Sequence, residues 1–394
     1  MRSSLRSSLL FLITVAAPCL TGCNALLGND EGIGSSVEPG EADKNTAGNG
    51  TDDGDASTSS VTKKKDASTT GPSDDSKPPC TNCEPELITD QVGRVTSLQV
   101  TATHVYWATA NGAYRIALSA APCKKTDCFE KIDTGDFGQV SVAVGDTNVY
   151  WSTSQEFGYA DLATMKSKKV DATTLKPSGS VMSLVGDDAY YVQSGYSIGS
   201  QATLVRGNAL KLATGTGGIS PISESSAGIQ TFTATSDYVA WATEARRVYV
   251  QPTGQKATEL QMPSDVSGWW ITSLSVYKGN AYISAMGNGG HILRAPLDGS
   301  EEATSVYNAP GRHIVVNAGG AFIAFGDYAN GVSNGIGWNP IDPNAAGAAD
   351  GKVLTELDSA EVMKMQVTND AVYYATYSTS SGGAAGIWKI AFDR

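Results

Sequence analysis

The sequence has little of what catalysis or nucleic-acid binding would need. Its 394 residues include only 3 histidines, and no H-E-x-x-H motif occurs. Charged residues make up 17% of the chain, the net charge is −12 and there is no basic run in the folded part. Nucleic acid and anionic membrane surfaces are therefore poor candidate partners. No cofactor or metal is expected.

Long apolar runs are also lacking, apart from "LLFLITVAAP" near the amino terminus, which is too short to span a bilayer comfortably. Arg2 and Arg6 precede this run and "LTGC" follows it at 20–23. Their order predicts a signal peptide over 1–22. "LTGC" resembles the lipobox of bacterial lipoproteins, which implies acylation of Cys23, often by palmitate, and a membrane partner. Asn24 after that Cys implies the outer membrane of the cell envelope. An ordinary secretory signal is the alternative.

Residues 23–84 contain almost no large apolar side chains. "SSVEPGEADKNTAGNGTDDGDASTSS" shows their Ser, Thr, Asp and Gly-rich character. Such a segment cannot bury enough apolar surface to offset its chain entropy, so it is expected to be a disordered tether. Its length corresponds to a root-mean-square span of roughly 40 Å. It would hold residues 85–394, the folded part, away from the membrane, although a linker of no selected length is the alternative.

The folded part repeats one short sequence motif. "THVYWAT" at 103–109 returns as "TNVYWST" at 147–153, "DYVAWAT" at 237–243 and "DAVYYAT" at 370–376. Seven such copies can be aligned, with a mean spacing of about 44 residues. Their centres are Tyr106, Tyr150, Tyr190, Val239, Tyr282, Phe322 and Tyr373. Each copy contains four short strands separated by polar turns, and no stretch holds a helical apolar period. The pattern predicts an all-β, seven-bladed β-propeller.

The two ends of the folded part are expected to share a blade. The chain finishes with "IWKIAFDR", which matches the third strand of a repeat and lacks a fourth. "PELITDQV" at 85–92 matches the fourth strands of other repeats. Pairing of these N- and C-terminal segments would close the ring and leave no exposed sheet edge.

The repeats resemble YWTD- and NHL-like propellers, most closely in "VYWATANGAYRIAL" and "GHILRAPLDG". The resemblance implies propeller blades throughout the folded part. Two features depart from the YWTD pattern, because Ala108 and Ser152 stand where Thr is usual and seven copies are present instead of six.

Four cysteines remain after export, and outside the cytoplasm an even number favours disulfides. Four cysteines allow three pairings. We favour Cys123 with Cys128, which bracket a short turn, and Cys80 with Cys83. A Cys₄ zinc site would require all four to converge, which their spacing does not suggest.

Propellers usually bind ligands on the face formed by fourth-to-first and second-to-third strand loops. Tyr, Trp and Arg in those loops are typical of recognition surfaces. The candidate binding residues are Trp269, Trp270, Arg94, Arg312, Tyr196, Tyr328 and Tyr377. Buried tryptophans in ordinary loops are the structural alternative.

Three functions remain open. The leading hypothesis is a membrane-tethered lipoprotein whose propeller binds a protein, peptide or glycan without chemistry. The second is a lyase or hydrolase over the central channel, with His313, Arg312 and Asp327 as acid, base or anion clamp. The third is a structural member of an envelope assembly. Convergence of those three side chains in one pocket would favour the enzyme.

Overall fold

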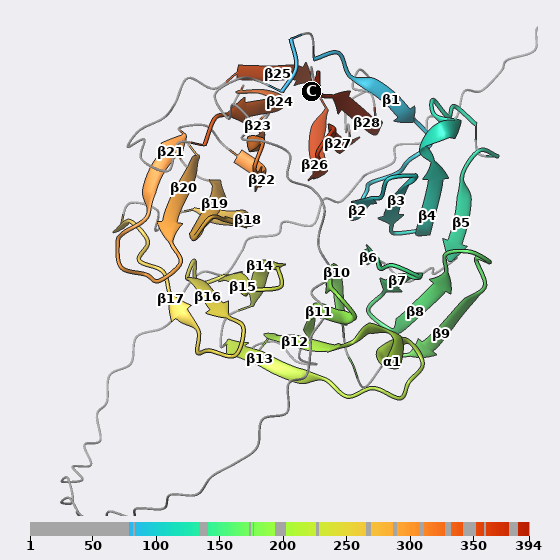
Figure 1. Cartoon of the computed structure of the whole chain (residues 1–394), viewed down its shortest axis with the longest axis horizontal. Helices are drawn as coiled ribbons and strands as arrows, with labels where there is room; N and C mark the ends of the chain where they lie inside the picture. Colours follow the sequence, from blue (N-terminus) through green and yellow to red (C-terminus); the bar gives the residue numbers. More distant parts are fainter. Residues whose placement is uncertain are drawn as a thin grey trace, which may run out of the picture. The chain divides into compact units, whose positions relative to one another are not determined.

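The described part of the chain is a ring of seven sheets. The structure, a computed structural model, describes residues 79–81, 83–125, 127–133, 141–172, 175, 177–193, 202–225, 228–264, 269–286, 290–307, 311–327, 332–341, 352–357, 360–377 and 385–393. These residues form seven four-stranded antiparallel sheets, set like blades around a central axis (Figure 1). The seven-bladed propeller is therefore confirmed. Among these residues, no helix is long and apolar enough to cross a bilayer.

Each blade runs from an inner strand beside the axis to an outer strand at the rim (Figure 1). Blade 1 contains β2 (Ser97–Val100), β3 (His104–Thr109), β4 (Gly112–Ala117) and β5 (Glu130–Asp133), with a 3-10 turn at Leu118–Ala120. Blade 2 contains β6 (Ser141–Val144), β7 (Asn148–Ser152), β8 (Glu156–Asp161) and β9 (Ser167–Asp171). Blade 3 contains β10 (Pro177–Val185), β11 (Asp188–Gln193), β12 (Ala202–Asn208) and β13 (Ser220–Ser225).

The remaining blades follow the same plan. Blade 4 contains β14 (Ile229–Ala234), β15 (Tyr238–Thr243), β16 (Val248–Pro252) and β17 (Thr258–Glu259). Blade 5 contains β18 (Trp270–Tyr277), β19 (Asn280–Met286), β20 (His291–Pro296) and β21 (Thr304–Tyr307). Blade 6 contains β22 (Gly311–Asn317), β23 (Gly320–Asp327), β24 (Val332–Asn339) and β25 (Lys352–Leu357). Blade 7 contains β26 (Glu361–Val367), β27 (Ala371–Tyr377), β28 (Gly386–Ala391) and β1 (Glu86–Thr89).

The second strand of each blade explains the repeated line in the sequence. In β3, Val105, Tyr106, Trp107 and Ala108 are all at most 2% exposed, although alternate residues point to opposite faces of the sheet. Both faces are covered because each blade packs against two neighbours, so consecutive residues must be apolar. The core therefore lies between the blades, in a series of clusters around the ring.

Strand β1 closes the ring. It pairs antiparallel with β28, with Glu86 opposite Lys389 and Leu87 opposite Trp388. Ile88, only 2% exposed, packs in the cluster between blade 7 and blade 1. The predicted pairing of the two ends is confirmed, and it supplies the fourth strand that the C-terminal segment lacks.

One element was not anticipated. In blade 3, β12 ends at Asn208 and a short helix, α1 (Ala209–Ala213), follows, although the sequence shows no helical apolar period there. The Asn208 side chain accepts a hydrogen bond from the Lys211 amide at 3.1 Å. This is an ordinary N-cap, and it favours the helical turn once the strand has left the sheet.

Candidate functional site

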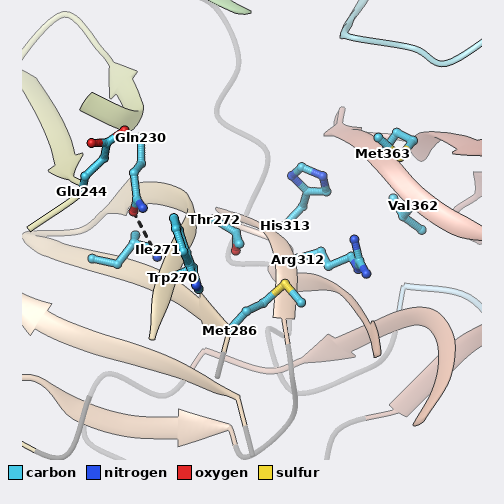
Figure 2. Close-up of a pocket in the computed structure, with 10 residues that line it drawn as sticks. All are labelled: Gln230, Glu244, Trp270, Ile271, Thr272, Met286, Arg312, His313, Val362 and Met363. Carbon is cyan, nitrogen blue, oxygen red and sulfur yellow. Dashed lines mark hydrogen bonds between the residues drawn. The ribbon is translucent and has the colours of Figure 1, made fainter. Parts of the chain in front are cut away.

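A shallow pocket of about 390 Å³ lies at one end of blades 4 to 7 (Figure 2). First strands begin and second strands end at this side of the ring, which we call the pocket face. It is the face formed by fourth-to-first and second-to-third connections. The residues that line the pocket are Gln230, Glu244, Trp270, Ile271, Thr272, Met286, Arg312, His313, Val362 and Met363.

A β-bulge recurs where the inner strand of each of these four blades begins. The register shifts between Ile229 and Thr231, and between Ile271 and Ser273. The same shift occurs in β22 and β26. A bulge adds one residue that has no partner on the neighbouring strand and redirects its side chain. The four added residues, Gln230, Thr272, Arg312 and Met363, all line the pocket.

Three of the four bulged side chains bond to the next blade. Gln230 Oε1 accepts a hydrogen bond from the Ile271 amide at 3.3 Å. The Thr272 hydroxyl donates to the Gly311 carbonyl at 3.2 Å. Arg312 Nη2 lies 3.1 Å from Glu361 Oε1. Met363 makes no such bond among the described residues, and blade 7 is joined to blade 1 instead by Gln366 Oε1, which accepts from the Val100 amide at 2.6 Å.

Basic side chains gather where blades 6 and 7 meet. Lys364 occupies in β26 the register position that His313 occupies in β22, since each lies opposite an alanine of the second strand. Burial and the nearby Lys364 ammonium lower the pKa of His313 to about 3, so its ring is neutral at physiological pH. Burial also lowers the pKa of Lys364. Within the described residues, no hydrogen bond or ion pair reaches this ammonium.

The two adjacent tryptophans among the predicted binding residues have opposite environments. Trp270 is 63% exposed and forms part of the pocket wall. Trp269 is only 7% exposed and stacks on the His291 ring, with the ring centroids 4.2 Å apart. His291 Nδ1 also lies 3.0 Å from Ser305 Oγ. Trp269 and His291 therefore form part of the core of blade 5.

The other predicted residues are only partly brought together. Arg312 and His313 both line the pocket, whereas exposed Arg94 and half-buried Tyr377 do not. Asp327 ends β23, but its side chain is not among the described ones. Cys23, Tyr196 and Tyr328 lie outside the described residues. The pocket thus unites Trp270, Arg312 and His313.

Sequence reasoning missed the rest of the pocket wall. Gln230, Thr272 and Met363 each lie near the start of a first strand. Nothing in a single sequence marks a bulge at such a position. Glu244 and Met286 lie at the ends of second strands and belong to different residue types. The sequence feature that they share is their position in the repeat, directly after the "VYWAT"-like motif.

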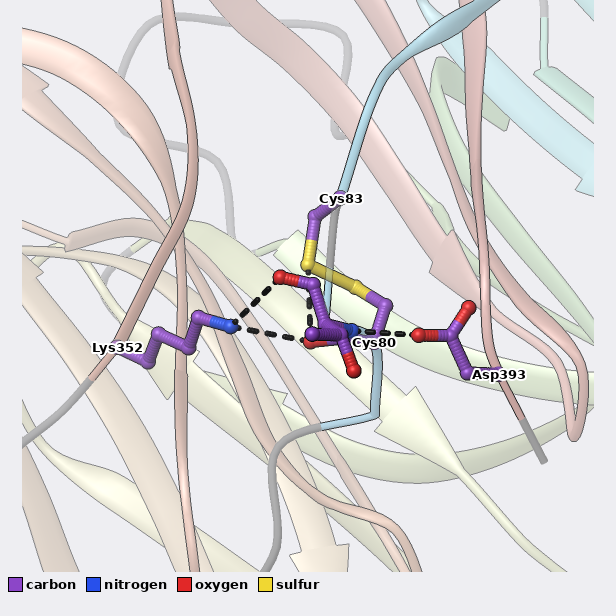
Figure 3. Close-up of a disulfide and its surroundings, with 5 residues drawn as sticks. Cys80, Cys83, Lys352 and Asp393 are labelled. Atoms are coloured by element: carbon purple, nitrogen blue, oxygen red, sulfur yellow. Dashed lines mark hydrogen bonds between the residues drawn. A yellow bond between two sulfur atoms is a disulfide. The ribbon is translucent and has the colours of Figure 1, made fainter.

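The opposite end of the propeller, the clasp face, holds the start of the folded chain. Cys80 and Cys83 form a disulfide, and Cys80 is buried against the cluster of blades 6 and 7 (Figure 3). Lys352 Nζ donates to the Cys80 carbonyl at 3.0 Å, while the Thr81 amide donates to Asp393 Oδ2 at 2.5 Å. The Asp393 amide also donates to the Pro79 carbonyl at 2.8 Å. We call this arrangement the clasp.

Strand direction places the clasp and the pocket at opposite ends of blade 6. Lys352 begins the fourth strand and lies opposite Trp338. The Trp338 indole donates to Gly319, in the turn where the first strand ends and the second begins. The pocket, in contrast, is formed where first strands begin. Pro79, Cys80 and Thr81, assigned to the tether from sequence, are therefore bonded to the face away from the pocket.

The second predicted disulfide is also present. Cys123 and Cys128 are joined with a Cα–Cα distance of 6.1 Å, in the connection between β4 and β5. The Cys123 amide donates to the Ile88 carbonyl at 2.8 Å. This small loop therefore braces β1 from the side of blade 1, as the clasp does from the side of blade 6.

Comparisons with known proteins support the fold alone. No family model matches the chain, and no curated protein matches it. Among solved structures, the Pan2 WD40 domain of Neurospora crassa is similar, with 10% identity, a TM-score of 0.55, and coverage of 81% of this chain and 98% of that one. The AfRom2 CNH domain is 9% identical, with a TM-score of 0.52, and the match covers 79% of this chain and 100% of that one. A computationally designed protein, Ika8, is 10% identical, with a TM-score of 0.50, and the match covers 78% of this chain and 100% of that one. Such likenesses do not transfer function.

Proposed function

We propose that this protein is a lipid-anchored, non-catalytic binding module that captures its ligand at the pocket face. The observation that carries the proposal is Trp270, a large aromatic side chain held 63% exposed in the wall of a pocket. Exposed aromatic and Arg side chains at a concave site are typical of interaction hot spots. A propeller is commonly a binding scaffold, which agrees with this function.

The position of the clasp indicates which face of the module would point toward the membrane. The predicted tether leads directly into Pro79 and Cys80, which are bonded to the clasp face. If Cys23 carries the lipid, the membrane lies on the side of the clasp face, and the pocket is presented away from it. This arrangement leaves Trp270 accessible to a partner beyond the membrane surface.

Binding is favoured over catalysis by the state of the polar side chains. A general acid or base works best when its pKa lies near the working pH, whereas that of His313 is lowered to about 3. Arg312 is engaged by Glu361 and by the Gly326 carbonyl. Neither residue is free in the way that the lyase or hydrolase hypothesis requires.

Site-specific crosslinking tests the binding site. A photoreactive amino acid replaces Trp270 in the full chain, expressed in cells that make the protein, and a matched chain carries it at Leu210. Leu210 is also exposed, at 42%, but lies on α1 at the rim of blade 3. We expect a discrete adduct from position 270 alone. Equal labelling at both positions, or none at 270, would contradict the proposal.

The anchor needs a separate test. Incorporation of radiolabelled palmitate is expected in the wild-type chain and absent from Cys23→Ser, which should leave the membrane fraction. If both chains are labelled, or neither is, the lipoprotein hypothesis is wrong, although the pocket could still bind its ligand.

A further inference from the structure

One strand of the ring is not held in its blade by the chain around it. In the other six sheets, the fourth strand follows the third directly along the chain, so a local connection keeps it in place. Strand β1 instead pairs with β28, at the opposite end of the folded part (Figure 1). Bringing two such distant segments together costs more loop entropy than closing a hairpin does. The junction of β1 and β28, which we call the seam, therefore needs contacts that the other fourth strands do not.

Strand β1 itself contributes few contacts to the seam. It contains four residues, of which Ile88 and Thr89 are buried, Glu86 is exposed and Leu87 is partly exposed. The Glu86 carboxylate lies 3.9 Å from Lys389 Nζ, but the Glu86 side chain is 64% exposed and such a surface pair stabilises little. What lies on either side of β1 must therefore supply part of the hold.

The first disulfide fixes the backbone that anchors the chain just before β1. Within the loop that Cys80 and Cys83 close, the Cys80 and Thr81 carbonyls both accept from Lys352 Nζ, at 3.0 and 3.4 Å (Figure 3). The Thr81 amide donates to the Asp393 carboxylate. These bonds require the two carbonyls and the amide to point in set directions, and the cross-link removes many alternative loop conformations. Breaking the disulfide should therefore weaken the hydrogen bonds of the clasp.

The second disulfide covers the other edge of β1. Cys123 forms a parallel bridge with Thr89, and the Cys123 amide donates to the Ile88 carbonyl at 2.8 Å. Cys123 also packs in the same buried cluster as Ile88, and its disulfide to Cys128 closes the loop that carries it. Strand β1 is thus bonded to β28 along one edge and to a disulfide-closed loop along the other. The two disulfides together use all four cysteines that follow Cys23 in the sequence.

We propose that the seam is a redox-controlled latch. While both disulfides are formed, β1 stays paired with β28 and the ring is closed; when they are reduced, β1 detaches more readily. If the predicted signal peptide exports the chain, the closed ring is favoured in an oxidising compartment and disfavoured before export. Release of β1 would leave β28 as an unpaired sheet edge, which can pair with other chains. The inference concerns the closure of the ring and does not depend on what the pocket binds.

The latch opens by thiol–disulfide exchange with an external thiol. Cys80 and Cys123 are each 1% exposed, whereas Cys83 and Cys128 are partly exposed, so the thiolate attacks the sulfur of Cys83 or Cys128. A mixed disulfide forms, and Cys80 or Cys123 leaves as a thiolate that takes up a proton. A second thiol then attacks the mixed disulfide, which releases the external thiols as a disulfide and leaves two cysteine thiols in the chain. Oxidation by an external disulfide runs the same steps in reverse.

Hydrogen exchange of the full chain, followed by mass spectrometry with and without dithiothreitol, tests the latch. A peptide that covers β1 is compared with one that covers β15, the second strand of blade 4. We expect amide exchange in β1 to become about tenfold faster or more after reduction, and exchange in β15 to stay the same. Unchanged exchange in β1 would overturn the proposal. Equal acceleration in both peptides would also overturn it, because the disulfides would then stabilise the whole fold and not the seam.

Serine variants show whether the cysteines themselves are responsible. Replacing Cys80 and Cys83 by Ser, or Cys123 and Cys128 by Ser, should make exchange in β1 about tenfold faster without reductant. A chain with all four substitutions should not respond to dithiothreitol, and a response would mean that the reductant acts elsewhere and the proposal is wrong. If that chain does not fold, the two states of the wild-type chain still decide. Crosslinking from position 270 tests the binding module separately.

Discussion

The two faces of this propeller differ in how completely their side chains are matched within the described part of the chain. On the clasp face, the Lys352 ammonium donates to two backbone carbonyls and the Asp393 carboxylate accepts from the Thr81 amide. On the pocket face, Lys364 has no partner among the described residues, and Trp270 remains 63% exposed. The clasp face has matched these groups within the chain, whereas the pocket face leaves a large aromatic ring exposed.

The difference follows from what each face must do. Closing a ring requires two distant chain segments to meet, and the entropy lost must be offset by bonds at the seam. A binding face benefits from side chains that remain free, because groups that are already hydrogen-bonded or paired within the chain have less to offer a ligand. Unmatched groups reduce stability, and proteins retain them mainly where function needs them. Substitutions on the two faces should therefore change different properties.

The largest expected effect is at the seam. Ile88→Ala removes a buried side chain from β1 and should lower the free energy of unfolding by about 2–4 kcal/mol. Val353, which is 45% exposed on β25, provides the control, because Val353→Ala should change stability by less than about 0.5 kcal/mol. Urea unfolding of both variants measures this. Similar losses in the two would mean that β1 does not hold the ring.

Opening the clasp should have the next largest effect. Replacing both Cys80 and Cys83 by Ser removes a short cross-link and should cost about 2 kcal/mol. The melting temperature should fall without added reductant, and crosslinking of a partner from position 270 should be unchanged. Loss of binding together with stability would show that the two faces are coupled and would contradict the comparison.

Acid should act through the pocket face. The pKa of His313 is about 3 in the folded chain and near 6.5 when unfolded. As the pH falls below 6.5, the unfolded chain takes up the proton first, so folding loses stability until about pH 3. His313→Gln removes this contribution, so between pH 7 and pH 4 the free energy of unfolding of the variant should fall by about 3 kcal/mol less than that of the wild type. Identical pH profiles in urea unfolding would exclude a buried, neutral His313.

The smallest effect on stability, and the clearest on binding, is expected at Trp270. Trp270→Ala should change the free energy of unfolding by less than about 0.5 kcal/mol and abolish capture of the ligand. Its neighbour is the matched contrast, because Trp269→Ala removes a buried ring and should cost about 3–5 kcal/mol. Calorimetry of the two variants with a binding assay separates them. Equal stability losses would mean that Trp270 serves the core.

Some of this architecture was predictable from sequence because it repeats. Tyr106, Tyr150 and Tyr373 stand in equivalent strands, and only a sheet covered on both faces requires that apolar run seven times. The pairing of 85–92 with the C-terminal strand followed from counting strands. The five-residue helix after Asn208 was missed, because so short a segment has no readable apolar period.

The candidate site was predictable only in part. Trp270, Arg312 and His313 were found because their residue types are conspicuous in loops, yet Trp269 was chosen with equal reason and is buried. Gln230, Thr272 and Met363 escaped notice because a bulge depends on strand register, which local sequence does not specify.

The sequence by itself determined the blade, its number and the closure of the ring, because those depend on short-range alternation and on repetition along the chain. Only the tertiary structure decided which tryptophan is exposed, which bulged residues line the pocket and that the clasp lies opposite the pocket. These features arise from contacts between blades about 40 residues or more apart, where burial and strand direction, not residue type, fix the outcome.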